Sequence, residues 1–352
     1  MTFSRNDTKV VKGIAIVLML YHHLFYFPER IAEGIEYIAL FHVGNYSAPY
    51  LIGEFGKICV SLFLFLGGYG TYLSCQKCGN DYTKIDETIF LKLKGLYGEY
   101  WKVFAIFVPI CILAGVETVD KNIQTMIWNF TGLSTSYCGE WWFLTPYIML
   151  LFTYPVAHRL LSKDSDLLRD LLCILIFKLF SAYILPTLPG YPWAAKVSGS
   201  MFWRLFYQMI THAPTFYMGC IVAKHNVLSL AKKCFSSGVK NWILAAVVFL
   251  AVFCLRHDNN MKYDYIFAPI VTVAVIVMLD RPLFRPIYRI FEKIGQEGTV
   301  IWLVHSIYCY MLCQKFVFLP RYTVLILLWL LAMSYATSVL LHGFFGLFRK
   351  RN

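Results

Sequence analysis

Ionisable side chains inside long apolar segments are the residues of this sequence best suited to chemistry. They are His22, His23, Lys102, Lys178, His212 and His305. Such groups are costly in hydrocarbon and usually mark function. His23 follows Lys12 by 11 residues, which in an α-helix is about 16 Å, half of a hydrocarbon core about 30 Å thick. The helical phase puts His23 and Lys12 on one face, whereas His22 points about 80° away.

His305 lies at a matching depth in a later segment. It follows Lys293 by 12 residues, or about 18 Å of helix. Two histidines at matched depth predict a shared cavity, and His212 also lies near the middle of its segment. The alternative for any one of them is a hydrogen bond to a neighbouring helix that stabilises the bundle. We favour that structural interpretation for His22 and Lys178.

The chemistry open to such a histidine is proton transfer. Imidazole has an ordinary pKa of about 6.5, which suits acid–base work near neutral pH. His23 could therefore activate a hydroxyl or an amine, or relay protons in a transporter. The residue types alone leave both possibilities open.

The composition indicates that lipid surrounds these segments. Of 352 residues, 59% are hydrophobic, 18% aromatic and 15% charged, with a mean hydropathy of +0.59. Soluble domains carry about 25% charged residues. The eleven cysteines are an odd number, and the Cys75–Cys78 pair has no second pair at ligand spacing. We therefore predict reduced thiols and no metal site.

Ten apolar segments can each supply the roughly 20 residues that a transmembrane helix needs. We predict an all-α, polytopic integral membrane protein, with both termini cytoplasmic and one transmembrane domain over residues 1–352. The predicted spans are residues 10–27, 53–74, 95–116, 141–160, 168–186, 202–223, 241–256, 264–280, 295–315 and 322–347.

The distribution of basic residues supports this topology. The predicted inner segments hold 21 of the 32 Lys and Arg residues and the outer loops hold 7, as expected when basic residues collect in cytoplasmic loops. This distribution accounts for the net charge of +12, so no nucleic-acid partner is predicted. Membrane lipid is the expected surrounding.

A mouth facing the outside is predicted where residues 117–140 lead into the fourth span. Glu140, Trp141 and Trp142 stand there, and we predict that they line this mouth and bind substrate. The alternative for each tryptophan is a place in the interfacial aromatic belt.

Five motifs, taken in order, resemble membrane acyltransferase family 3. Lys12-Gly13-Ile14-Ala15 followed by His23 is similar to the family's Arg-Gly-x-Ala with a histidine eleven residues after the arginine. The stretch from Gly56 to Tyr72 is similar to G-V-D-L-F-F-V-L-S-G-F, with Ser61 in place of the aspartate.

The later motifs complete the resemblance. Trp141 to Pro155 resembles the family's W-F-L…Y…P span, and Gly295 to His305 resembles G-K-x-S-Y-x-I-Y-L-x-H. The third span departs most from the pattern: Lys92 matches the first arginine of Arg-x-x-Arg, Gly95 stands at the second, and Lys94 is a substitute on another face.

The resemblance implies a multi-pass acyltransferase of the cell membrane, expected to be a bacterial plasma membrane. It would move an acyl group, usually acetyl, from cytoplasmic acyl-CoA to a hydroxyl of a cell-envelope glycan or a related acceptor. His23 and His305 would be catalytic, and Lys12, Lys92 and Lys94 would bind the CoA phosphates. Acyl-CoA would be the donor substrate, and no bound cofactor is expected. The oligomeric state is left open.

Other functions stay open at this stage. One is a membrane transporter, against which stands the lack of a duplicated half or paired broken spans. Another is a catalytically degenerate family member, which the departures from Arg-x-x-Arg keep possible. For Lys92 and Lys94, the alternative is that they only set the topology.

Overall fold

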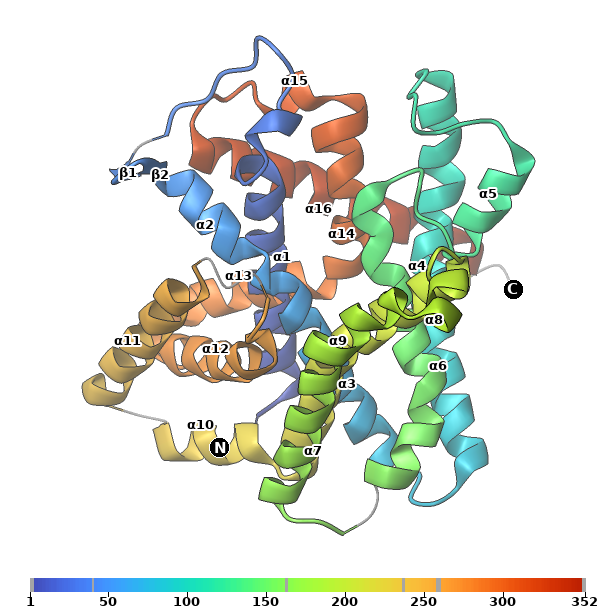
Figure 1. Cartoon of the computed structure of the whole chain (residues 1–352). Coiled ribbons are helices and arrows are strands. Elements are labelled where there is room, and N and C mark those ends of the chain that lie inside the picture. Colours follow the sequence, from blue (N-terminus) through green and yellow to red (C-terminus); the bar gives the residue numbers. More distant parts are fainter. Residues whose placement is uncertain (1–2, 40, 162–163, 236–237, 258–260, 350–352) are drawn as a thin grey trace.

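A computed structural model describes residues 3–39, 41–161, 164–235, 238–257 and 261–349. Figure 1 shows that these residues are mostly helical. In the described part of the chain, strands are confined to the short antiparallel pair β1 (His42–Val43) and β2 (Tyr46–Ser47).

The helices follow one another with short connections. The α-helices are α1 (Arg5–Phe25), α2 (Ala48–Gly56), α3 (Ile58–Gln76), α4 (Tyr82–Leu113), α5 (Ile123–Phe130), α6 (Leu144–Leu161), α7 (Leu167–Leu179), α8 (Pro192–Ser198), α9 (Met201–Lys224), α10 (Val227–Phe235), α11 (Val239–Arg256), α12 (Asp264–Leu279), α13 (Arg285–Gln296), α14 (Gly298–Ser306), α15 (Gln314–Val317) and α16 (Thr323–Arg349). The 3-10 helices are η1 (Pro28–Arg30), η2 (Gly139–Phe143), η4 (Leu185–Gly190) and η5 (Pro282–Phe284), and the π-helices are η3 (Phe180–Ile184) and η6 (Ile307–Leu312).

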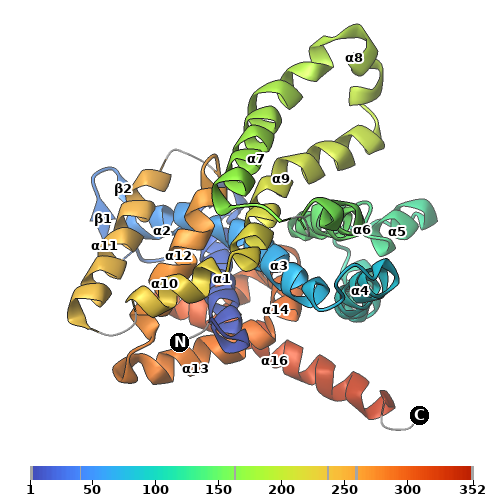
Figure 2. The ribbon, with the colours of Figure 1, turned by 90° about the horizontal axis from the view of Figure 1, so that it is seen from below.

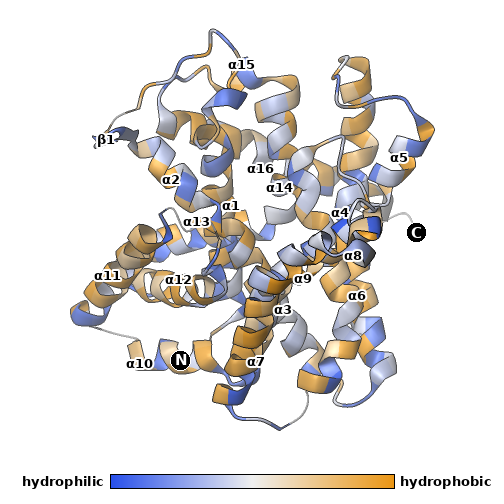
Figure 3. Cartoon of the chain, in the orientation of Figure 1, coloured by the Kyte–Doolittle hydropathy of each residue, from blue (hydrophilic) through white to orange (hydrophobic). Residues whose placement is uncertain are grey.

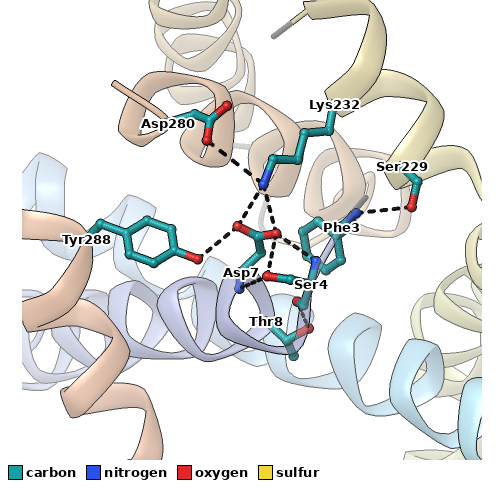
Figure 4. A network of polar contacts seen from close by, with 8 residues as sticks. All are labelled: Phe3, Ser4, Asp7, Thr8, Ser229, Lys232, Asp280 and Tyr288. Carbon is teal, nitrogen blue, oxygen red and sulfur yellow. Dashed lines mark hydrogen bonds and ion pairs between the residues drawn. The ribbon is translucent and has the colours of Figure 1, made fainter. Parts of the chain in front are cut away.

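Helix α1 lies at the centre of the molecule and packs against α2, α3, α13, α14 and α16 (Figure 1). Its first turn is fixed by a capping box in which Ser4 and Asp7 bond each other's backbone N–H groups. The buried Asp7 carboxylate also accepts bonds from Lys232 of α10 and Tyr288 of α13, at 3.0 Å each (Figure 4). A paired and fully bonded carboxylate can be buried without a large penalty. The network therefore ties the start of α1 to two other helices.

Close backbone contacts between helices occur at glycines. A Cβ on Gly13 would overlap the Phe291 carbonyl, and one on Gly295 would overlap the Lys9 carbonyl. Helices α1 and α13 can therefore approach only because both positions lack a side chain, as at many membrane helix interfaces. The same relation joins Gly68 of α3 to α9.

The lipid-facing surface is apolar. Figure 3 shows hydrophobic residues along α7, α9, α11 and α12, and side chains such as Ile176 are well exposed. In the view from below, α7, α8 and α9 form an arm that extends away from the other helices (Figure 2). An exposed apolar surface of this extent is expected when lipid is the solvent.

The structure supports the predicted fold class and leaves the number of spans open. Helices occur in all ten predicted segments. Six helices in the described chain are long and apolar enough to cross a membrane, and α12 with α13 makes a further pair that is bent by 98°. Three predicted spans lie in helices that are not long and apolar enough by this criterion: residues 141–160, 202–223 and 295–315. The count of ten and the cytoplasmic termini stay predictions.

The helix that contains most of the third predicted span begins before that span. Helix α4 starts at Tyr82 rather than near residue 95, because the Asp81 side chain accepts a bond from the Lys84 N–H and caps the helix. The polar stretch with Lys84, Lys92 and Lys94 is therefore helical.

Candidate active site

A cavity of about 490 Å³ runs beside α1 between helices from both halves of the chain. Its volume is in the range of about 300–1,000 Å³ that is typical of small-molecule sites. The lining residues include Lys12, Met19, His22, His23, Phe27, Arg30, Lys57, Cys59, Phe63, Glu140, Trp142, Tyr147, Gly295, Gln296, Thr299 and Trp302. Basic side chains thus lie at both ends of the cavity, and His23 lies between them.

The rings of His23 and His305 are in contact. Their centroids are 5.0 Å apart, and His305 of α14 stands behind His23, outside the cavity lining. His305 Nδ1 lies 2.6 Å from the Trp302 carbonyl oxygen. His305 Nε2 and His23 Nδ1 are both buried and have no hydrogen-bond partner among the described residues. The two histidines of matched depth are therefore in contact, but only His23 lines the cavity, so the predicted sharing of one cavity by both rings is not seen.

This arrangement fixes the tautomer of His305. A carbonyl oxygen only accepts, so Nδ1 of His305 carries the proton and Nε2 keeps its lone pair in the neutral ring. Centroids 5.0 Å apart let an N–H of His23 turn toward that lone pair. His23 would then hold its own lone pair on Nε2, where the ring meets the cavity. An oriented imidazole of this kind can act as a general base.

His22 differs from His23 in having a structural bond. Its Nδ1 lies 2.7 Å from the carbonyl oxygen of Gly53 on α2, and its ring stacks on Tyr26. A Cβ on Gly56 would overlap the Leu18 carbonyl, so α1 and α2 are tightly packed at this point. The predicted structural interpretation of His22 fits these contacts, although its ring also forms part of the cavity wall.

The predicted donor-binding lysines are only partly brought together. Lys12 lines the cavity near Gly295 and Thr299, whereas Lys92 and Lys94 do not. Lys92 Nζ lies 3.5 Å from the Gly70 carbonyl oxygen and is close enough to Lys12 for their charges to interact. Lys94 is exposed on another face of α4, as its helical phase requires. Lys57, which sequence reasoning left unassigned, adds a second basic group to the wall.

Polar and aromatic groups form another part of the cavity wall. Glu140 of η2 forms an ion pair with Arg30 of η1, with 2.7 Å between Oε1 and Nη1. Trp142 lines the cavity as predicted. Trp141 is a correction: only 1% of it is exposed, and its Nε1 donates to the Leu303 carbonyl oxygen at 2.8 Å. Consecutive residues of a 3-10 helix point about 120° apart, so Trp141 packs into the core and holds η2 against α14.

A comparison with protein-family models bears on this site. The model described as an acyltransferase domain matches residues 6–343, nearly the whole chain. The chain belongs to membrane acyltransferase family 3. A search of curated proteins and a search of solved structures gave no significant match. The resemblance predicted from the five motifs is therefore confirmed, and the match contains both histidines and Lys12.

The largest feature of this acyltransferase that sequence reasoning missed is a buried ion pair. Asp264 Oδ1 and Oδ2 accept bonds from Arg256 Nε at 2.9 Å and Nη2 at 3.0 Å, and Ser61 Oγ donates to Oδ2 at 2.8 Å. Arg256 Nη1 donates to the carbonyl oxygens of Glu54 and Phe55. Ser61 was a signal of this ion pair in the sequence, because it stands where the family has an aspartate. The carboxylate at this place comes instead from Asp264 of α12, to which Ser61 donates.

The remaining intramembrane groups of the acyltransferase lie away from the cavity lining. His212 Nδ1 is 2.7 Å from the Gln208 carbonyl oxygen of its own helix, and its ring lies 5.3 Å from that of Trp142. Lys102 pairs with Glu99 at 2.8 Å. Lys178 stands 5.9 Å from the Tyr265 ring, the distance of a weak cation–π contact.

Proposed function

We propose that this acyltransferase transfers an acetyl group from cytoplasmic acetyl-CoA to a hydroxyl of a cell-envelope glycan. The observation that carries the proposal is His23, which lines the cavity while its ring contacts a histidine of fixed tautomer. The proposal includes a bacterial plasma membrane as the site of action.

The proposed step balances around His23 Nε2. This nitrogen takes the proton of the acceptor hydroxyl, and the hydroxyl oxygen attacks the thioester carbonyl. The carbon–sulfur bond then breaks, and the CoA thiolate takes up the proton to leave as a thiol. The His305 lone pair accepts the N–H of His23 and stabilises the imidazolium that forms, as an orienting group does in a catalytic triad.

The charge at the other end of the cavity supports a CoA donor. Lys12 lies about 16 Å along α1 from His23, so an extended thioester arm can join phosphates at Lys12 to an acyl group at His23. Ammonium groups are usable phosphate partners, and Lys57 supplies another one on the wall. In this proposal Lys92 contributes by its nearby charge, and Lys94 has no contact with the donor.

The proposed acceptor-binding groups are Glu140 and Trp142. Both line the outer part of the cavity, and a carboxylate beside an aromatic ring suits the hydroxyls and the apolar face of a sugar. Trp141 is not included, because its indole is occupied by the bond to Leu303.

The test follows labelled acetyl groups. The purified protein is incubated with acetyl-CoA labelled in the acetyl group and with extracted envelope glycan, and label in the glycan is counted. We expect transfer by the parent and a loss of about 10²- to 10⁴-fold for His23→Ala, the contribution of a positioned base.

His158→Ala is the matched control, because His158 is another buried histidine, bonded to Tyr154 far along α6. It should transfer at the parental rate. Parental transfer by His23→Ala would disprove the assigned role. No transfer by a parent protein that still binds acetyl-CoA would favour a catalytically degenerate member. The family assignment already favours an acyltransferase over a transporter.

A further inference from the structure

A second cavity of about 430 Å³ lies directly beyond the outer end of the first. The two cavities share Arg30, Gly139 and Glu140 as lining residues. The remaining lining of the second cavity is Val116, Glu117, Thr118, Ser136, Tyr137, Cys138, Tyr310 and Met311. The Arg30–Glu140 ion pair therefore stands on the boundary between a chamber that contains His23 and a polar vestibule.

The ion pair is held in place from several sides. The Arg30 guanidinium lies 4.5 Å from the centroid of the Phe27 ring and 5.1 Å from that of Tyr310. The Arg30 carbonyl oxygen accepts a bond from Gln314 at 2.9 Å. Burial acts to lower the pKa of Arg30, but the Glu140 carboxylate outweighs it and the pKa is raised. The Arg30 guanidinium therefore stays positively charged throughout the neutral pH range.

Residues on the Glu140 side of the ion pair are also held by hydrogen bonds. The Glu140 carbonyl oxygen accepts a bond from Trp302 Nε1 at 3.2 Å, and Tyr310 OH donates to the His23 carbonyl oxygen. Trp302 is the residue whose carbonyl oxygen fixes His305. Trp302 therefore connects Glu140 to His305, and Tyr310, which contacts Arg30, is bonded to the backbone of His23. The same two residues position the ion pair and the histidine pair.

The lining of the vestibule indicates the kind of ligand it fits. Glu117, Thr118 and Ser136 are exposed toward it, and hydroxyl and carboxylate groups suit a ligand with many hydroxyls. The partly exposed Tyr310 side chain adds aromatic surface, whereas Tyr137 is only 1% exposed and supports the wall from behind. Two carboxylates face one guanidinium, so the lining has an excess of negative charge and an anionic ligand would be repelled.

We propose that this vestibule binds an uncharged polyhydroxy acceptor, and that the Arg30–Glu140 ion pair is the barrier which the acceptor displaces to reach His23. The assignment of the ligand as an acceptor rests on the proposed function; the barrier itself does not. Sugar hydroxyls can replace both halves of the pair, donating to Glu140 and accepting from Arg30. Without an acceptor, the closed pair keeps water of the vestibule away from the thioester.

The barrier is tested by the accessibility of a cysteine in the chamber. Val60 lines the chamber and is replaced by the similarly sized cysteine in Val60→Cys. Intact cells are treated with a membrane-impermeant, positively charged methanethiosulfonate, which the vestibule does not repel, and modification at position 60 is followed by peptide mass spectrometry. We expect Arg30→Ala to raise the modification rate at least tenfold over Val60→Cys alone, and the exchange Arg30→Glu with Glu140→Arg to restore the slow rate.

Lys102→Ala is the matched control for this test. This change breaks the 2.8 Å ion pair between Lys102 and Glu99, and neither of these residues lines either cavity. It should leave the modification rate at position 60 unchanged. If Val60→Cys is modified at the same rate with and without Arg30→Ala, whether that rate is slow or fast, the ion pair is not a barrier. This readout requires no acyl transfer, so it can succeed where the proposed function fails.

The ligand class is tested separately with methyl β-glucopyranoside and methyl β-glucuronate as acceptor probes. We expect labelled acetyl transfer to the uncharged probe to exceed transfer to the anionic one by at least fivefold. Glu117→Gln should narrow this ratio, because it removes one of the two carboxylates. Equal transfer to both probes by the parent would overturn the assignment to an uncharged ligand. Absence of transfer to either probe, with normal transfer to envelope glycan, would overturn the vestibule as a general sugar site.

Discussion

The cavity around His23 and the cluster around Asp264 both place ionisable groups among membrane helices, but they satisfy them differently. In the Asp264 cluster, both carboxylate oxygens are bonded, and Arg256 donates to Asp264 and to two backbone carbonyl oxygens. At His23 and His305, two buried ring nitrogens have no hydrogen-bond partner among the described residues. Satisfied groups of this kind hold helices together, whereas two facing ring nitrogens with no other partner can orient His23 so that its remaining nitrogen takes a reacting proton.

The two regions also use different helices. The Asp264 cluster joins the α2–α3 junction to α11 and α12. The histidine pair joins α1 to α14 beside the cavity. Damage to the first region should therefore lower stability, and damage to the second should lower activity. The predictions below test this division.

The largest effect on stability is expected from Asp264→Ala. The change leaves the Arg256 guanidinium buried without its counter-charge, which typically costs about 3–5 kcal/mol. Unfolding in denaturing detergent, followed by circular dichroism, measures the loss. Asp280→Ala is the control, because the Asp280 side chain is 30% exposed and its only ion-pair contact, with Lys232, is as long as 4.0 Å among the described residues; its loss should cost less than about 1 kcal/mol. An unchanged midpoint for Asp264→Ala would contradict the structural role.

A smaller effect on stability is expected at the close contact between α1 and α13. Gly295→Ala would push α13 away from the Lys9 carbonyl, and overpacking of this kind costs about 1–3 kcal/mol. Because Gly295 also lines the cavity, acetyl transfer should fall as well. Gly98→Ala is the control: a Cβ there meets nothing within 4 Å, so stability should be unchanged or slightly higher. Equal stability of Gly295→Ala and Gly98→Ala would show that the α1–α13 contact is not tight.

The smallest effect is expected at the donor end of the cavity. Lys12→Gln removes a charged partner of the proposed phosphate contact, worth about 1.5 kcal/mol, and should raise the KM for acetyl-CoA about tenfold. Initial rates over a range of acetyl-CoA concentrations measure this. Lys94→Gln should leave the KM unchanged, because Lys94 is exposed away from the cavity. A rise for Lys94→Gln alone would place the donor elsewhere.

The sequence predicted the depth and direction of a side chain correctly where these depend on the geometry of a single helix. The depth of His23 and His305 and the separate direction of His22 follow from the rise and phase of an α-helix, and the contacts of all three agree with them. The direction of Lys94 away from Lys92 followed from the same phase. The motifs in order also led to the correct family.

What the sequence did not reveal depends on contacts between segments. Arg256 is the last residue of the predicted span 241–256, where the sequence indicated no partner for it, yet only 3% of it is exposed, because Asp264 and the α2–α3 junction surround it. Trp141 and Trp142 are adjacent, and only the turn of η2 decides that one faces the core and the other the cavity. The ion pair between Arg30 and Glu140 joins residues 110 positions apart, which no local pattern indicates.

The central claim is that His23 and His305 act as one unit, and a double-mutant cycle tests it most directly. The initial rate of labelled acetyl transfer is measured for the parent, His23→Ala, His305→Ala and the double variant, each with its unfolding midpoint. Residues that act as a unit give strongly non-additive losses. We expect the double variant to be no slower than His23→Ala alone, with all four proteins folded. Losses that multiply, or a His23→Ala variant with the parental rate, would contradict the account.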